Sequence, residues 1–323
     1  MGNITPKILC IGSVTQDVYL LAPDIFLPRQ VDGERVIQLP LGAKLDLEKV
    51  IITSGGNATN AATTFARQGL ESIFMGVLGA DAMSESILHE LDSEGIDTRY
   101  VHQDERYKTG YATVILAPNG ERTIMRAHGQ KLRADGSDIN LQALEQADWL
   151  YLSSVGSIQL LEKIVSLAAK HNTKIAFNPS TAELQQPEKI RPLLEDVSVL
   201  IANKEEMQIL VEGTTSEELV RHAVHFVDIV IVSDGPNGAI ASDGKQIITA
   251  GMYEDVKVVD RLGAGDAFGS GFTAMIAQGK TLNDAVIFAS ANSTSVVTKI
   301  GAKTGILHGS HNLHAMPITI TDL

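Results

Sequence analysis

The sequence predicts an α/β protein: a three-layer α/β/α sandwich with a mostly parallel central sheet and a small β-sheet lid. Short apolar runs of strand length alternate with helix-type patterns along the chain, which is typical of βαβ units. Two segments without a convincing helix, residues 17–53 and 98–126, interrupt this alternation. With 323 residues, of which 44% are hydrophobic and 20% charged, the chain is long and apolar enough for a large core. We therefore expect a single domain spanning residues 1–323, with the two segments inserted as the lid.

The strands of the expected sheet are short apolar runs bounded by turn-forming or polar residues. They lie at residues 7–12, 72–79, 149–153, 174–178, 197–202 and 229–233. The expected helices are 82–95, 158–171, 188–194, 205–211, 216–226 and 282–298. In doubly wound sheets, ligands bind at the carboxyl ends of the strands. Polar residues that follow these strands are therefore candidates for a site.

The two interrupting segments are rich in β-forming residues. Residues 17–53 contain three prolines, and residues 98–126 contain the turn signal Pro118-Asn119-Gly120. Asn-Gly supplies the positive φ angles of a tight hairpin, so residues 111–117 and 121–125 should pair. Two such segments should form a small separate sheet. We interpret this sheet as a lid over a site, and a decorative or dimerising flap is the alternative.

Composition and charge disfavour several classes of protein. The 26 Lys and Arg residues against 39 Asp and Glu leave a formal net charge of −13, which disfavours a nucleic-acid partner. No apolar run approaches the roughly 18 residues of a membrane span, so we expect no membrane partner. A single cysteine, Cys10, excludes a disulfide framework and a cysteine-based zinc cluster. Residues 1–6 carry no targeting signal, which predicts a cytoplasmic protein.

The most informative stretch joins an expected strand, residues 256–259, to a helix through the sequence Asp-Arg-Leu-Gly-Ala-Gly-Asp. Gly263, Ala264 and Gly265 allow several backbone N–H groups to converge at the positive end of a helix, which forms an anion cradle. Asp266 follows directly, where it could accept a proton from a hydroxyl while the cradle stabilises a transferring phosphoryl group. The alternative is that Asp266 only stabilises the helix N-terminus.

Two further sets of residues are suited to holding a polyol. Asn57 and Asn60 follow a glycine pair that includes Gly56, and their spacing puts both amides on one face of a helix. The alternative is an Asn N-cap followed by an ordinary surface Asn. Asp17 comes shortly after the first strand, where it could accept hydrogen bonds from vicinal hydroxyls, although a surface turn is equally compatible.

Two polar segments follow expected strands in the second half of the chain. Asn203 and Glu206 come after residues 197–202, so their polar groups should face a ligand crevice. Ser233, Gly235 and Gly238 come after residues 229–233, where small residues let the backbone approach a flat or phosphorylated ligand. A plain glycine-rich hairpin turn is the alternative for the second segment.

Taken in order, the glycine pair with Asn-x-x-Asn, the Asn-x-x-Glu and the Asp-x-x-Gly-Ala-Gly-Asp resemble the ribokinase-like (PfkB) carbohydrate kinase family over almost the whole chain. The resemblance implies a ribokinase-like fold and transfer of the γ-phosphoryl group of ATP to a hydroxymethyl group of a sugar, with Mg²⁺. It implies that Asp266 is the general base, that the amides of Gly263, Ala264 and Gly265 form an anion hole, and that Asp17, Gly56, Asn57 and Asn60 hold the sugar. It further assigns Asn203 and Glu206 to magnesium and the phosphates, with Glu206 acting indirectly, and Ser233, Gly235 and Gly238 to the nucleotide. A monovalent cation such as K⁺ would bind Asp260 and carbonyl groups around residues 300–302.

The sequence departs from the family pattern at three places. Arg261 and Leu262 stand where the family usually has threonines, so a backbone carbonyl must replace a hydroxyl at the cation. Ser153 and Ser154 stand where ribokinases tend to have a glutamate for ribose, which weakens the case for ribose itself. Asn57 replaces a lysine that is frequent in phosphosugar kinases, which argues against a sugar phosphate.

Two other functions remain open at the level of sequence. One is a nucleoside (adenosine-type) kinase of the same family, whose base pocket would be built from Phe26, Tyr107 and Tyr111. The other is a non-catalytic sugar- or nucleotide-binding sensor, against which Asp266 and the intact Gly-Ala-Gly argue. We also expect a homodimer formed through the lid. Histidines 308, 311 and 314 stand three apart, and we interpret them as part of a mobile tail and not as a metal site.

Overall fold

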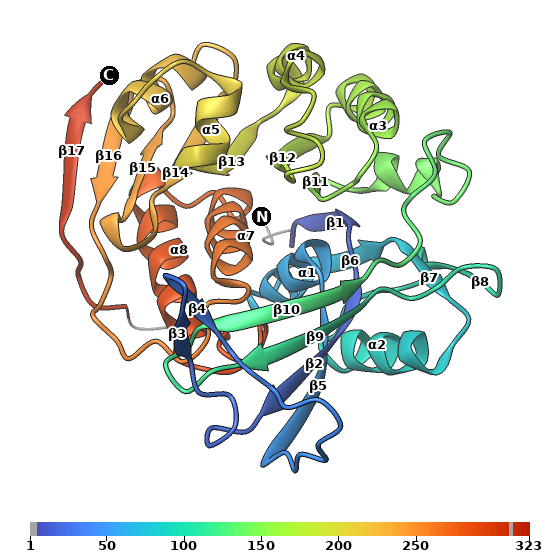
Figure 1. Cartoon of the computed structure of the whole chain (residues 1–323). Coiled ribbons are helices and arrows are strands. Elements are labelled where there is room, and N and C mark those ends of the chain that lie inside the picture. The colour runs from blue at the N-terminus through green and yellow to red at the C-terminus, as the bar shows by residue number, and fades with distance from the viewer. Residues whose placement is uncertain (1–4, 310–312) are drawn as a thin grey trace.

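The computed structural model of the chain describes residues 5–309 and 313–323, and its main element is a nine-stranded sheet (Figure 1). Six neighbouring strands pair in parallel, and the last three are added antiparallel. In spatial order they are β6 (Glu71–Met75), β1 (Lys7–Gly12), β11 (Trp149–Ser153), β12 (Lys174–Asn178), β13 (Val199–Asn203), β14 (Ile229–Ser233), β15 (Ala239–Ser242), β16 (Gln246–Ala250) and β17 (Ile318–Asp322). The prediction of a mostly parallel central sheet is confirmed.

Helices cover both faces of this sheet and complete three layers. Successive residues of a strand point to opposite faces, and β1 shows the result. Ile8 and Cys10 pack in one buried cluster, whereas Leu9 and Ile11 pack in the other. The first cluster is covered by α1 (Asn57–Arg67), α2 (Ala82–Ser93), α7 (Ala264–Ala277) and α8 (Leu282–Val297). The second is covered by α3 (Ile158–His171), α4 (Pro187–Ile190), α5 (Lys204–Leu210), α6 (Ser216–Ala223) and the 3₁₀ turns η1 (Leu141–Gln146) and η2 (Arg191–Asp196).

A separate four-stranded sheet lies beside the central one and forms the lid. Its spatial order is β10 (Arg122–Ala127), β9 (Tyr111–Leu116), β2 (Thr15–Leu21) and β5 (Lys49–Gly55). The expected hairpin is present, because β9 and β10 pair antiparallel around the Asn-Gly turn. Strands from both interrupting segments therefore pair with one another, as predicted. Two small pairs stay outside the lid: β3 (Arg29–Val31) with β4 (Glu34–Val36), and β7 (Val77–Gly79) with β8 (His102–Asp104).

Three expected elements differ from the structure. Residues 72–79 are not one strand, because the chain turns at Gly76 and passes from β6 in the central sheet to β7. The expected helix 188–194 is split into α4 and η2, with Pro192 at the start of η2, where it has no N–H for an α-helical hydrogen bond. The expected strand at 256–259 is wrong. This segment is a loop whose Val259 N–H donates to the carbonyl of Val297 at the end of α8.

Among residues 5–309 and 313–323, no helix combines the length and the apolar character that crossing a membrane would require. Of the three spaced histidines, His311 lies outside the described residues. His314 stacks on the ring of Tyr253, with 4.2 Å between the ring centroids.

Candidate active site

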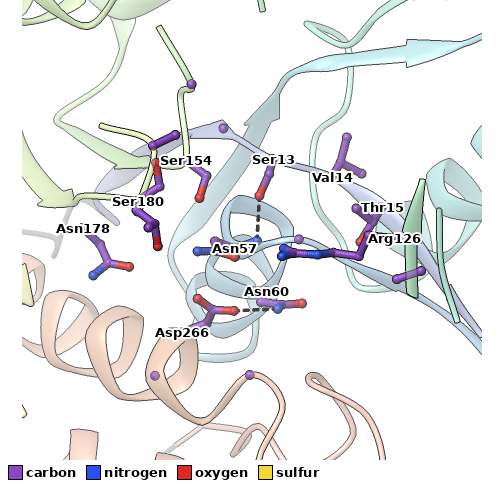
Figure 2. A pocket seen from close by; sticks show the side chains of 18 of the residues that line it. Ser13, Val14, Thr15, Asn57, Asn60, Arg126, Ser154, Asn178, Ser180 and Asp266 are labelled. Atoms are coloured by element: carbon purple, nitrogen blue, oxygen red, sulfur yellow. Dashed lines mark hydrogen bonds between the residues drawn. The ribbon is translucent and has the colours of Figure 1, made fainter. Parts of the chain in front are cut away.

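A cavity of about 630 Å³ lies between the lid and the carboxyl ends of the central strands (Figure 2). Residues at or directly after the carboxyl ends of β1, β11, β12 and β13 contribute to its lining, as expected for a doubly wound sheet. The structure brings ten of the predicted site residues to this one cavity: Asp17, Gly56, Asn57, Asn60, Asn203, Glu206, Ser233, Gly263, Gly265 and Asp266.

Four predicted site residues lie elsewhere. Gly235 and Gly238 do not line the cavity, and Gly238 packs against the backbone of Ala250 across the β-sheet. Asp260 is buried behind the cradle. Ala264 also stays off the cavity wall, and its N–H points back toward the Arg261 carbonyl at 3.4 Å. Of the three residues predicted for the anion cradle, Gly263 and Gly265 line the cavity and Ala264 does not.

The cradle depends on the backbone conformation of Gly263, the N-cap of α7. Its φ angle is +79°, and a Cβ atom at this position would lie only 2.4 Å from the Cβ of Ala302. Glycine is therefore required both for the positive φ and for the close approach of the neighbouring loop. Asp260 ties the same loop to the cradle, because its carboxylate accepts the N–H of Leu262 at 3.0 Å and that of Gly301 at 3.1 Å.

Asp266 lies in the first turn of α7 and faces Asn60 on α1 (Figure 2). The Asn60 Nδ2 amide donates a hydrogen bond of 2.8 Å to Asp266 Oδ2, while the buried Asn60 Oδ1 has no partner among the described residues. Burial raises the pKa of Asp266 to about 6, and the Asn60 donor and the positive charge of Lys303 partly oppose that rise. A carboxylate with this pKa is ionised at neutral pH and is basic enough to accept a proton.

Asp17 lies on β2 and is only 5% exposed. Its Oδ1 accepts a 2.8 Å hydrogen bond from the Thr15 hydroxyl. Gly55, on the neighbouring strand β5, must be small, because a Cβ at this position would lie 2.0 Å from Asp17 Oδ2. Burial raises the pKa of Asp17 above its ordinary value. Of the glycine pair before α1, Gly55 therefore makes room for the Asp17 carboxylate, and Gly56 makes room for the backbone of Ser13 and Val14.

Lys303 is a buried positive charge that sequence reasoning missed. It is 4% exposed, donates a hydrogen bond to the Ser54 hydroxyl, and lies 3.9 Å from Glu90 Oε1. Glu90 in turn accepts the Ser54 N–H at 2.6 Å. Burial lowers the pKa of Lys303 to about 8. This lysine joins the loop that supports the cradle to the end of lid strand β5.

The opposite part of the cavity carries Asn203 and Glu206 at the start of α5. Their side chains and backbone N–H groups form a reciprocal capping box, with hydrogen bonds of 2.8 and 2.9 Å. Burial raises the pKa of Glu206. Among the described residues, no cluster of three or more His, Cys, Asp or Glu side chains could hold a metal by itself. A magnesium ion here would need phosphate and water ligands in addition to the protein, which is how Mg²⁺ is commonly bound.

Several polar residues that line the cavity were not predicted. Asn178 and Ser180 follow β12, and the rule that ligands collect at strand ends could have found them. Arg126 comes from β10 of the lid, and only the register of that strand shows that it faces the cavity. Of the three aromatic residues considered for a base pocket, Tyr111 lines the cavity and Phe26 does not. Tyr107 does not line it either, and its hydroxyl donates to Asp138 at 2.7 Å.

Comparison with known proteins finds similar chains. The family model described as pfkB family carbohydrate kinase matches residues 5–308. A ribokinase of Haemophilus influenzae is 27% identical over 289 residues, which cover 85% of this chain and 92% of that protein. A 5-dehydro-2-deoxygluconokinase of Bacillus velezensis is 28% identical over 263 residues, which cover 76% of this chain and 79% of that protein. Among solved structures, the Arabidopsis thaliana ribokinase with ribose and ATP superposes with a TM-score of 0.75 at 22% identity, covering 94% of this chain and 96% of that one.

Proposed function

Since the chain belongs to the pfkB family of carbohydrate kinases, which are phosphotransferases with an alcohol group as acceptor, we propose that it transfers the γ-phosphoryl group of ATP to a hydroxymethyl group of a sugar. The observation that carries the proposal is the position of Asp266. This carboxylate faces a cavity large enough for a small ligand, next to the Gly263–Gly265 cradle and within hydrogen-bond distance of Asn60.

In the proposed reaction, Asp266 takes the proton of the acceptor hydroxyl as the oxygen attacks the γ-phosphorus in line with the leaving ADP. A positioned base contributes about 10²–10⁴-fold to the rate. The N–H groups at Gly263 and Gly265 would stabilise charge on the transferring group, and the loss of one such donor costs about 10²–10³-fold. Asp17, Asn57 and Asn60 would hold the other hydroxyls of the sugar, with the unpartnered Asn60 Oδ1 as a free acceptor. The lid would exclude water, which otherwise competes as an acceptor.

Glu206 and Asn203 are suited to the nucleotide side of the reaction. A bound magnesium ion would neutralise charge on the triphosphate. Glu206 would hold it through water, since a single carboxylate with phosphate and water ligands is a common magnesium environment. Ser233 lies at the cavity wall, just before the glycine-rich turn in the sequence, and would contact the nucleotide. Gly235 and Gly238 do not line the cavity, and their contact with the nucleotide stays a prediction.

We also propose that a monovalent cation binds at Asp260, and this proposal rests on a separate observation. The Asp260 side chain is buried, with the residue only 1% exposed, and none of the described Lys, Arg or His side chains forms an ion pair with it. Buried charges are normally compensated. Both oxygens accept one backbone N–H each, which leaves further lone pairs for a cation. Replacing sodium by potassium should then raise the activity, and an unchanged rate would contradict the cation site.

We also propose that the lid forms a homodimer. Residues on its strands alternate between the cavity side and the opposite side, and the opposite side exposes Val50 (47%), Ile52 (62%) and Met125 (52%). Apolar patches on an open sheet are typical of interfaces. Sedimentation analysis should give a dimer that Ile52→Lys weakens. A monomer at all accessible concentrations would contradict this part of the proposal.

A single assay tests the main proposal: ADP release measured across pentoses, hexoses, sugar acids, nucleosides and phosphosugars. We expect turnover with at least one sugar and its loss in Asp266→Asn. Preference for a nucleoside would favour the adenosine-type alternative, which only Tyr111 of its three expected aromatic residues supports. Binding of a sugar without any ADP release would favour the non-catalytic sensor.

A further inference from the structure

Arg126 places a positive charge in the cavity for which the proposed reaction has no use. Its side chain extends from β10 over the start of α1 (Figure 2). No carboxylate of residues 5–309 or 313–323 forms an ion pair with it. By contrast, Arg35 on the neighbouring hairpin pairs with Glu121, and Arg106 pairs with Asp104. A guanidinium group stays charged at physiological pH, so Arg126 is an exposed cation at the cavity without a counter-ion among the described residues.

The strand register aligns Arg126 with Asp17. Arg126 pairs with Ala112 on β9, and Ala112 pairs with Asp17 on β2. Paired residues of neighbouring strands point to the same face, and two strand spacings amount to about 10 Å. Asp17 and Arg126 therefore face the cavity from the same row of the lid, with only the small Ala112 side chain between them. A ligand whose hydroxyls bind Asp17 lies within reach of the long arginine side chain.

A second cation follows Arg126 in the chain. Lys131, on the segment after β10, lines the same cavity. Helix α1 begins at Asn57 and has no acidic residue in its first turn, so the positive end of its dipole is not compensated there. The proposed reaction already uses the acidic residues Asp17, Glu206 and Asp266 of the cavity. Asp17 binds hydroxyls, Glu206 serves the nucleotide, and Asp266 accepts a proton.

We propose that Arg126 binds a carboxylate of the acceptor, so that the substrate is a sugar acid and not a neutral sugar. This inference rests on the proposed kinase function and adds the specificity of the acceptor site. A sugar acid offers one partner to each of three groups: an alcohol to Asp266, hydroxyls to Asp17 and a carboxylate to Arg126. The planar guanidinium matches a carboxylate with two parallel hydrogen bonds, which a lysine would not provide.

A phosphate ester would supply the same negative charge. We favour the carboxylate because one guanidinium fork satisfies its two oxygens with two parallel hydrogen bonds. The two sources are separated by the choice of acceptors in the test.

The test measures kcat and KM for 2-dehydro-3-deoxygluconate, D-ribose and D-fructose 6-phosphate at saturating ATP and Mg²⁺. The proteins are the wild type, Arg126→Gln, Arg126→Lys and the control Arg99→Gln, whose guanidinium is exposed and pairs with Asp97 outside the cavity. We expect the sugar acid to have the highest kcat/KM in the wild type. Arg126→Gln should raise its KM by about 10- to 100-fold, the value of a hydrogen-bonded charge pair. The KM for ATP should not change, Arg126→Lys should be intermediate, and Arg99→Gln should behave as the wild type.

A second readout does not depend on turnover: the shift in melting temperature that 2-dehydro-3-deoxygluconate alone causes in the wild type and in Arg126→Gln. The shift should be present in the first and lost in the second. If the wild type prefers ribose or fructose 6-phosphate, the carboxylate proposal is overturned while the kinase function stands. An equal rise of the KM for ATP in Arg126→Gln would assign Arg126 to the triphosphate and overturn it too. If no acceptor is phosphorylated but the Arg126-dependent shift in melting temperature is seen, the proposed kinase function fails and the carboxylate site stands. If neither phosphorylation nor this shift is seen, the kinase function and the carboxylate site both fail.

Discussion

The side-chain amide of Asn60 on α1 donates a 2.8 Å hydrogen bond to the carboxylate of Asp266 on α7, across 206 positions of the sequence. This bond joins the residue proposed as the base to one proposed to hold the acceptor. It also favours the charged form of Asp266, because a hydrogen bond donated to a carboxylate stabilises its ionised state.

Asp266→Asn should reduce kcat by about 10³-fold or more, because the amide cannot accept the proton of the acceptor hydroxyl. Affinity for ATP, measured by calorimetry, should stay close to that of the wild type. Asp284→Asn is the matched control, since Asp284 is the first-turn acid of the next helix and does not line the cavity. An Asp266→Asn enzyme with nearly normal kcat would remove Asp266 from the role of base.

The activity should fall on the acid side of pH 6. The pKa of Asp266 is raised to about 6, so below that pH the carboxyl is increasingly protonated and cannot act as a base. Asn60→Ala removes the hydrogen bond that lowers this pKa, so the acid limb of the kcat/KM profile should move to higher pH. The same variant should raise the KM for the acceptor more than that for ATP. Equal effects on both KM values, with an unmoved acid limb, would show that Asn60 acts only through the fold.

Lys303→Met should change the pH dependence of both activity and stability. The positive charge of Lys303 lowers the pKa of Asp266, so its removal should also shift the acid limb upward. Burial lowers the pKa of Lys303 from 10.5 to about 8, so the unfolded chain binds more protons than the folded one between these values. The free energy of unfolding of the wild type should therefore rise with pH from about 8 to 10.5. Denaturant titrations should find this rise reduced in Lys303→Met, and an identical slope in both proteins would contradict the burial of a charged lysine.

Gly263→Ala should damage the cradle. Gly279 provides the control, because its φ of +72° resembles the +79° of Gly263 while no atom lies within 4 Å of a Cβ placed there. Gly279→Ala should lower stability by about 1 kcal/mol from backbone strain alone and retain its kcat. Gly263→Ala adds the contact with Ala302, which displaces the N–H groups, so kcat should fall by about 10²-fold or more. Equal kcat values for the two variants would argue against the cradle.

Local patterns predicted the central elements well. Residues 149–153, 174–178 and 229–233 are strands with the expected bounds, and residues 158–171 form the expected helix. Buried strands and amphipathic helices are determined largely by their own apolar spacing. Residues 256–259 have the composition of a strand, yet they form a loop, and β16 pairs instead with β17 from the end of the chain. Whether a segment of this composition joins a sheet depends on tertiary packing as well as on propensity.

In the candidate site, too, some residues could be predicted from their own neighbourhood in the sequence and others could not. Motifs at strand ends, such as Asn57 with Asn60 and Asp266, could be found because their chemistry is concentrated in a few neighbouring residues. Lys303 contacts Ser54 across 249 positions, and nothing in its own neighbourhood indicates that it is buried. The Ala264 amide was assigned to the cradle from a glycine-rich sequence, whereas the turn directs this N–H toward the Arg261 carbonyl. Individual amide directions follow from backbone angles that composition does not specify.

The loop at residues 299–305 touches the base of the cradle through Ala302 and the end of a lid strand through Lys303. Substitutions on either side of this loop are therefore not independent. A change in the angle of the lid, for example to admit a bulkier acceptor, should also displace the turn at Gly263, which we propose to contact the transferred group. Redesign of the acceptor range in this enzyme should accordingly be attempted with the loop and the lid varied together, because altering the lid alone will carry a penalty in turnover.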